Sequence, residues 1–232
     1  MENILEVNGV TKSFSGKSVL NRMSFKLEEG KVLGILGPNG NGKTTILNII
    51  AGLLQPDSGE VKVNGMNVGR ETKEVVSFLR ENNQFYPWMK IEDSIGFYKD
   101  FFPDFDEKRA RELLKFMNIE GNSKLVSLSK GMLEKVSLSL VLGRKSKLYI
   151  LDEPISGVDI LSRDEIVNAL IEYMIDGASM IITTHYVGEL EKLLDKVVFI
   201  KDGIIVESGE ADDIREKYKA SIEGAYKEIF KR

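Results

Sequence analysis

The chain has no cysteine and only one histidine. Without cysteine there can be no disulfide bond and no thiolate metal site, and a single histidine excludes most zinc arrangements. This composition favours a reducing compartment.

Long apolar runs and an excess of charge of one sign are also missing. No stretch approaches the eighteen consecutive apolar residues of a membrane-spanning helix, and the first residues lack the basic and apolar regions of a signal peptide. The formal net charge is −4, with both signs mixed along the chain. This mixture argues against a protein that binds nucleic acid by counterion release. We predict a cytoplasmic protein that reaches a membrane only through a partner.

The most informative feature of the sequence is one glycine-rich motif. Residues 37–45 read GPNGNGKTT and match G-x-x-x-x-G-K-[ST], between apolar runs at 32–36 and 46–50. A strand, a glycine loop and a helix in this order form a cradle for phosphates, with Lys43 reaching the β- and γ-phosphates and Thr44 offering a hydroxyl to Mg²⁺. We predict that a nucleoside triphosphate binds Gly37, Pro38, Asn39, Gly40, Asn41, Gly42, Lys43, Thr44 and Thr45.

Two later apolar runs end in polar residues. Residues 147–151 precede Asp152 and Glu153, and residues 180–184 precede His185, with helical spacing between the two runs. Strand, helix and strand imply a parallel sheet, whose ligands bind at the carboxyl ends of the strands. We expect Asp152 to hold Mg²⁺ through water and Glu153 to deprotonate the attacking water. The two acids could instead cap the following helix.

The rest of the chain alternates between strand and helix patterns. Apolar and polar residues alternate at 4–7, 23–27 and 60–63, and a short buried strand is predicted at 75–79. Further patterns predict helices after Asp106 and from Ser129 to Gly143, a hairpin at 197–207, and a helical C-terminal segment interrupted at Gly224.

Aromatic residues are concentrated in one part of the chain. About half of them, including the only tryptophan, fall within residues 78–105. They could form the core of a small helical subdomain or a surface that docks another protein, and the two interpretations are compatible. The residues are Phe78, Phe85, Tyr86, Trp88, Phe97, Tyr98, Phe101, Phe102 and Phe105.

Taken together, the motifs resemble the nucleotide-binding subunit of an ATP-binding-cassette transporter, and the resemblance covers essentially the whole chain. Residues 128–132 (LSKGM) are similar to the signature L-S-G-G-Q, and residues 156–159 (SGVD) are similar to the D-loop. His185 falls at the switch histidine. Phe14 matches the aromatic residue that stacks on adenine, although its local pattern alone fits an ordinary surface or core phenylalanine equally well.

The resemblance implies a mechanism in which two copies face each other head to tail. Each ATP then lies between the phosphate loop of one copy and the signature of the other, where Ser129 and Gly131 are expected at the γ-phosphate and Asp159 at the nucleotide interface. His185 would contact the γ-phosphate and hold the water or Glu153 in line. The implied partners are a second nucleotide-binding subunit, identical or not, and integral membrane permease subunits.

Two departures from the family pattern stand out. In the signature, Lys130 replaces a glycine and Met132 replaces a glutamine. At the position of the Q-loop glutamine, the register places Glu81, with Gln84 three residues later. We favour Glu81, and therefore expect Thr44, Asp152 and Glu81 to form the metal set.

The fold implied by the resemblance is α/β: a P-loop NTPase (RecA-like) parallel sheet core with an antiparallel β subdomain and an inserted α-helical subdomain. We expect one ABC ATPase domain over residues 1–232. Residues 1–84 and 146–210 would form the β subdomain and the core, residues 85–145 the helical subdomain with the signature, and residues 211–232 a C-terminal helical segment.

The function implied by the resemblance is ATP hydrolysis that energises export through a separate permease. Aromatic-rich segments near residues 86–89 and 98–106 further resemble a bacterial subgroup with ABC-2 type partners. The alternatives are a soluble ATP-switched protein of the same superfamily and a GTP-binding switch. The first usually carries two cassettes or a long coiled-coil insertion, and the second carries an N-K-x-D motif, and the chain shows neither.

Overall fold

The computed structural model describes residues 2–81, 85–86, 88–174 and 177–231. Its strands are β1 (Asn3–Phe14), β2 (Lys17–Glu28), β3 (Val32–Leu36), β4 (Ser58–Val63), β5 (Met66–Asn67), β6 (Val76–Leu79), β7 (Leu148–Asp152), β8 (Ser179–Thr184), β9 (Lys196–Lys201) and β10 (Ile204–Glu210). Its helices are α1 (Lys43–Ile50), α2 (Thr72–Val75), α3 (Ile91–Phe101), α4 (Glu107–Phe116), the 3₁₀ turn η1 (Leu125–Ser127), α5 (Lys130–Leu142), α6 (Ile160–Tyr173), α7 (Val187–Leu190), α8 (Ala211–Tyr218) and α9 (Ile222–Phe230).

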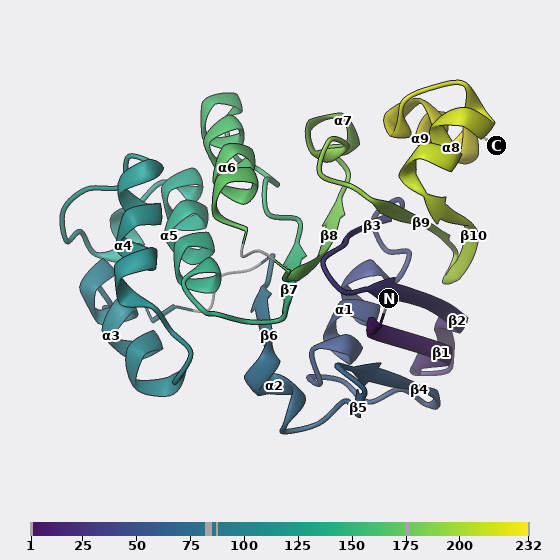
Figure 1. The fold of residues 1–232 in the computed structure, drawn as a ribbon, viewed down its shortest axis with the longest axis horizontal. Helices are drawn as coiled ribbons and strands as arrows, with labels where there is room; N and C mark the ends of the chain where they lie inside the picture. The colour runs from purple at the N-terminus through teal and green to yellow at the C-terminus, as the bar shows by residue number, and fades with distance from the viewer. Residues whose placement is uncertain (1, 82–84, 87, 175–176, 232) are drawn as a thin grey trace.

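A mixed sheet runs through the middle of the molecule in the order β10-β9-β3-β8-β7-β6 (Figure 1). All neighbouring pairs are parallel except β9 with the edge strand β10. Every residue of β3, β7 and β8 is buried, which explains why these strands appear in the sequence as continuous apolar runs. The carboxyl ends of the three strands lie at one edge, so the predicted parallel sheet and its polar strand ends are confirmed.

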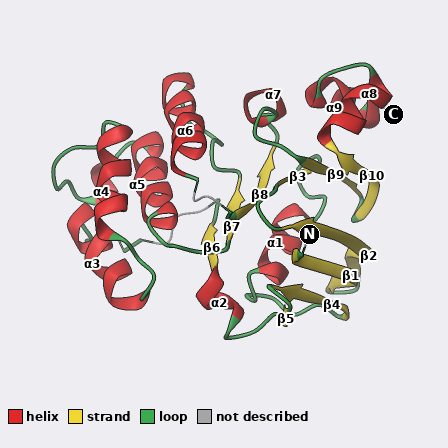
Figure 2. Cartoon of the chain, in the orientation of Figure 1, coloured by secondary structure: helices red, strands yellow, loops and turns green. Residues whose placement is uncertain are grey.

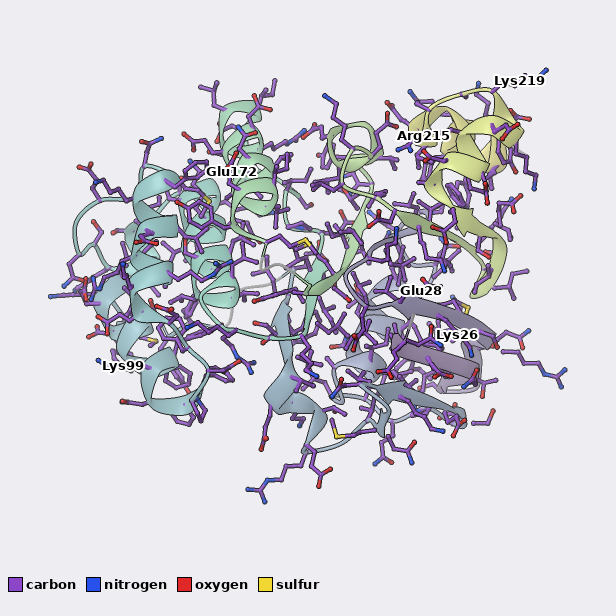
Figure 3. All side chains as sticks on the ribbon, viewed as in Figure 1. Lys26, Glu28, Lys99, Glu172, Arg215 and Lys219 are labelled. Atoms are coloured by element: carbon purple, nitrogen blue, oxygen red, sulfur yellow. The ribbon has the colours of Figure 1, made fainter. Side chains whose placement is uncertain are left out.

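A second, antiparallel sheet of order β2-β1-β4-β5 carries the alternating pattern. Along β2, buried Met23, Phe25 and Leu27 alternate with exposed residues, because one face covers an apolar cluster that also includes α1. The two sheets are joined by an ion pair of 2.8 Å between Lys196 of β9 and Glu28 of β2. Glu28 is labelled in Figure 3. The hydrogen bond from Lys196 holds the pKa of Glu28 below the usual value.

Helices α3, α4 and α5 gather on one side of the molecule, away from the antiparallel sheet (Figure 2). Asp106 caps α4 by accepting the N–H of Arg109 at 3.1 Å, as its position predicts. The predicted apolar stripe of Ala110, Leu113 and Met117 is buried. Hydrophobic packing of this stripe therefore fixes α4 against its neighbours.

Seven of the nine aromatic residues of this region divide into two groups. Phe85, Tyr98 and Phe105 pack against the apolar cluster of the helical group. By contrast, Trp88 and Phe101 are 65% and 66% exposed, and Tyr86 and Phe97 are also exposed. The core interpretation thus holds for the first group, and the second leaves an apolar surface that the fold itself does not bury.

The C-terminal segment is helical, but the predicted break at Gly224 is wrong. The chain leaves α8 at Lys219, whose φ of 48° is left-handed, and α9 begins after Ser221. Ser221 caps α9 by accepting the N–H of Gly224 at 3.1 Å. A serine cap outweighs the modest helical cost of a glycine in the first turn, so the helix begins before Gly224.

Candidate nucleotide-binding site

The predicted phosphate loop joins β3 to α1, and at two of its positions steric constraints require glycine. Gly42 has a φ of 95°, in the left-handed region that favours glycine, and it caps α1. A Cβ atom at Gly37 would lie 2.3 Å from the carbonyl oxygen of Ile200. The loop therefore packs against the end of β9, and α1 begins at Lys43.

The side chain of Asn41 fixes the shape of this loop. Its amide nitrogen donates to the carbonyl oxygens of Pro38 and Asn39 at 3.1 and 3.2 Å. Its oxygen accepts the N–H of Asp202, in the β9–β10 turn, at 2.6 Å. The side chain of Asn41 thus holds the loop in its conformation.

Lys43 lies inside the loop with only 6% of its surface exposed. Its Nζ donates to the carbonyl oxygen of Gly37 at 2.7 Å and lies 3.5 Å from Oε1 of Glu153. The second contact is an ion pair without hydrogen-bond geometry, so this oxygen has no hydrogen-bond partner among the residues that the structure describes. A buried ammonium and a buried carboxylate therefore face the same space.

Asp152 and Glu153 follow β7 beside β8, as the sequence predicts, and Thr183 of β8 links them. Thr183 Oγ1 donates to Asp152 Oδ1 at 2.6 Å and accepts the N–H of Glu153 at 3.0 Å. No motif in the sequence marks Thr183 as a site residue. The available signal is a polar side chain in the last positions of an apolar strand, and its partner depends on the register that pairs Asp152 with Thr183.

The oxygen atoms at this position fit Mg²⁺. Burial raises the pKa of Asp152, while hydrogen bonds from Thr183 and Thr44 act in the opposite direction. Those contacts place the Thr44 hydroxyl beside the Asp152 carboxylate. Mg²⁺ is commonly bound by one or two carboxylates together with substrate phosphates, and Thr44 and Asp152 supply ligands of that kind.

Glu153 is held in an unusual backbone conformation. Its φ of 54° is left-handed, which is uncommon for a residue with a side chain and frequent at functional sites. Its Oε2 lies 2.8 Å from Nδ1 of His185 and accepts the backbone N–H of His185 at 3.2 Å. The predicted base and the predicted switch histidine are thus in direct contact.

A cavity of about 350 Å³ opens over the phosphate loop. It brings together the loop, the end of β7 and the end of β8, three segments that are distant in the sequence. The residues lining it are Val19, Asn39, Gly40, Gly42, Lys43, Thr44, Thr45, Glu81, Glu153, Ser156 and His185. Val19 is a lining residue that the sequence did not indicate.

Glu81, the residue that we favour for the Q-loop position, follows β6 and lines this cavity. Glu81 therefore lines the same cavity as Lys43 and Thr44. The alternative, Gln84, lies outside the described residues.

The signature residues form a second cluster. Ser129 caps α5 and accepts the N–H of Met132 at 3.2 Å. A Cβ atom at Gly131 would lie 3.0 Å from Ser162 Oγ and 3.3 Å from Asp159 Oδ2, so α5 and α6 begin side by side. Neither Ser129, Gly131 nor Asp159 lines the cavity over the phosphate loop.

Asp159 caps α6 by accepting the N–H of Ser162 at 3.0 Å, and this hydrogen bond lowers its pKa. Phe14, at the end of β1, is 47% exposed, and the Lys12 ammonium lies 5.6 Å from its ring centroid. Phe14 is not among the residues lining the phosphate-loop cavity. Within one chain, most of the predicted site residues therefore belong to the cavity, the signature cluster or a separate aromatic position, whereas Gly37, Pro38, Asn41 and Asp152 do not line the cavity.

Comparison with known proteins shows the family of this chain. The family model described as "ABC transporter" matches residues 20–156. The linearmycin resistance ATP-binding protein LnrL of Bacillus subtilis is 30% identical, over 91% of this chain and 70% of its own length. The Nod factor export ATP-binding protein I of Rhizobium etli is 28% identical, over 90% and 69%.

A solved structure of an ATP-binding subunit of an ABC transporter superposes with a TM-score of 0.88 at 27% identity, covering 97% of this chain and 99% of the other. Among the described residues, no helix is both long and apolar enough to cross a membrane. The family match spans more than half of the chain and contains the phosphate loop and both carboxylates. The chain therefore belongs to the ABC transporter family, as an ATP-binding subunit that hydrolyses ATP.

Proposed function

We propose that two copies of this chain pair head to tail, with each ATP held between the phosphate loop of one copy and the signature of the other. The observation that supports this most directly is that Ser129 and Gly131 lie outside the phosphate-loop cavity of their own chain. Beside them, Ile160 and Leu161 are 74% and 76% exposed. Pairing through this surface would remove these apolar side chains from water.

In this proposal, Lys43 and the loop amides bind the phosphates, and Phe14 stacks on the base. Thr44, Asp152 and Glu81 would hold Mg²⁺. When bound, Mg²⁺ neutralises charge on the phosphate oxygens. Lys43, whose Nζ lies 3.5 Å from Glu153 Oε1, would supply the positive charge that faces the phosphates.

Glu153 would take the proton of the attacking water. Its buried Oε1 has no hydrogen-bond partner among the described residues and faces the cavity wall formed by Lys43. Its Oε2 is occupied by His185. One oxygen is therefore oriented by the protein, and the other is the one proposed to receive the proton.

A mixing experiment tests the head-to-tail pairing. Lys43→Ala removes the loop cation, and Ser129→Arg blocks the signature, so each variant alone should be inactive. A mixed pair keeps one intact loop opposite one intact signature. In an equal mixture, random exchange should restore about a quarter of the wild-type rate of phosphate release. A mixture as inactive as its components would show that the loop and the signature do not act across two copies.

We further propose that the pair acts at the inner face of a membrane, where it drives export through a separate permease. The name of the Rhizobium relative refers to export, and that of the Bacillus relative to resistance. In this chain, a cleft of about 190 Å³ lies beside β6 and is lined by Phe85, Tyr86, Phe97 and Tyr98, among others. Exposed Trp88 stacks on Tyr86, with ring centroids 5.8 Å apart.

Replacing both Tyr86 and Trp88 by alanine should weaken permease binding by about tenfold or more, because exposed aromatic anchors carry much of the energy of an interface. The measurement is retention of the integral membrane partner from detergent-solubilised membranes, with ATP binding as a check on the fold. Ile204→Ala removes a similarly exposed apolar side chain from β10 and should have no effect. Equal retention by the double variant and the wild type would rule out this docking surface.

A further inference from the structure

Arg163 lies in the first turn of α6, directly after the D-loop, at a position that is unfavourable for a cation because of the helix dipole. Its side chain is nevertheless only 16% exposed. Nε donates to the carbonyl oxygen of Val158 in the D-loop at 2.9 Å, and Nη1 donates to Oε1 of Glu189 in α7 at 2.9 Å. The guanidinium thus joins the D-loop to the helix that follows the switch histidine.

The same guanidinium lies against an aromatic ring. Cζ of Arg163 is 3.9 Å from the ring centroid of Tyr186, within the range of a strong cation–π contact. The Tyr186 ring also contacts the imidazole of His185, with centroids 4.0 Å apart. The backbone N–H of Tyr186 donates to Thr184 Oγ1 at 2.9 Å, which fixes this residue at the end of β8.

The contacts form a continuous series that ends at the hydrolytic carboxylate. It runs from the Val158 carbonyl through Arg163 and Tyr186 to His185, whose Nδ1 lies 2.8 Å from Glu153 Oε2. At its other end, Val158 directly precedes the Asp159 cap and the exposed Ile160. A shift of the D-loop backbone would therefore displace the guanidinium that supports the ring beside His185.

We infer that Arg163 is a positioning residue that transmits closure of the paired copies at the D-loop, through Tyr186, to His185 and Glu153. The inference rests on the proposed head-to-tail pairing, because pairing is what would move the D-loop. Arg163 does not line the phosphate-loop cavity, so it acts on turnover and not on ATP affinity.

Replacing Arg163 with lysine separates charge from geometry. Lysine keeps the charge but cannot stack a planar group on Tyr186 while donating in the two directions that reach Val158 and Glu189. We expect Arg163→Lys to lower kcat by about tenfold, with little change in KM for ATP. Tyr186→Leu should have a similar effect. Tyr186→Phe keeps the ring and should retain most of the wild-type rate.

The only histidine of the chain provides a spectroscopic readout at the end of this series of contacts. In the nucleotide-free chain, the single imidazole resonance of His185 should shift in Arg163→Lys and in Tyr186→Leu, and the shift in the double variant should be smaller than the sum of the two. Arg215→Lys is the matched control. Arg215 of α8 (Figure 3) donates to the carbonyl oxygen of Glu191 and has no aromatic contact among the described residues. This variant should leave both kcat and the resonance unchanged.

The two readouts separate this inference from the proposed pairing. An unchanged kcat in Arg163→Lys, or an unmoved His185 resonance, would overturn the positioning role. Failure of the mixing experiment would instead refute pairing, while the resonance would still move because the contacts lie within one chain. The positioning role would also be overturned if Tyr186→Phe lowered kcat as strongly as Arg163→Lys does. The phenylalanine ring preserves the proposed path, so this variant should stay active.

Discussion

Replacing Lys43 with alanine is expected to weaken ATP binding by about thirtyfold to several thousandfold, which corresponds to about 2–5 kcal/mol for truncating a buried, hydrogen-bonded charged group. The reason is the burial of this ammonium inside the phosphate loop, next to the Gly37 carbonyl and opposite Glu153. In the variant, the phosphates would meet a buried carboxylate without the cation that faces it. Both the lost attraction and the remaining repulsion act against binding.

Titration calorimetry with ATP in the presence of Mg²⁺ measures this effect. Lys147→Ala is the matched control, because Lys147 is exposed and donates to Asn64 at 3.1 Å, far from the cavity lining. The control should bind ATP as the wild type does. If Lys43→Ala kept wild-type affinity while remaining folded by circular dichroism, the loop would not be the phosphate site.

The phosphate loop and the polar strand ends could be predicted because each depends on local pattern. A glycine at 42 permits the left-handed turn before α1, and continuous apolar runs indicate strands that are buried on both faces. Since parallel strands end at one edge, Asp152 and His185 were expected near the loop, and the structure places Glu153 and His185 in its cavity. The residues that act on the phosphates remain a prediction.

Contacts that depend on register and on side-chain direction could not be predicted in the same way. The link through Thr183 requires β7 and β8 to pair with Asp152 opposite Thr183. The contact of Arg163 with Tyr186 joins α6 to the residue that precedes α7, with β8 between them in the sequence, and nothing in either segment indicates it. The wrong prediction at Gly224 has a local cause, because the cap formed by Ser221 stabilises the first turn of α9 more than the glycine destabilises it.

Replacing Glu153 with glutamine is expected to lower kcat by about 10²- to 10⁴-fold while leaving ATP binding intact, which is the effect of losing a positioned general base. Glutamine has nearly the same shape, and its oxygen can still accept the N–H that His185 donates to Oε2. The variant side chain is neutral and has no carboxylate oxygen that could take a proton. The cavity keeps its shape because the two side chains are nearly isosteric. It loses the proposed chemistry because an amide cannot accept a proton from water.

The oligomeric state of this variant then tests whether hydrolysis is what separates the proposed pair. With ATP and Mg²⁺, light scattering after size-exclusion chromatography should show Glu153→Gln as a dimer, whereas Glu112→Gln, which changes an exposed carboxylate of α4, should keep the wild-type rate and oligomeric state. An unchanged rate of phosphate release in Glu153→Gln would remove Glu153 as the base. A low rate in a variant that binds ATP and yet stays monomeric would keep the base and refute ATP-driven pairing, because ATP trapped between a loop and a signature must hold the two copies together for as long as it is not cleaved.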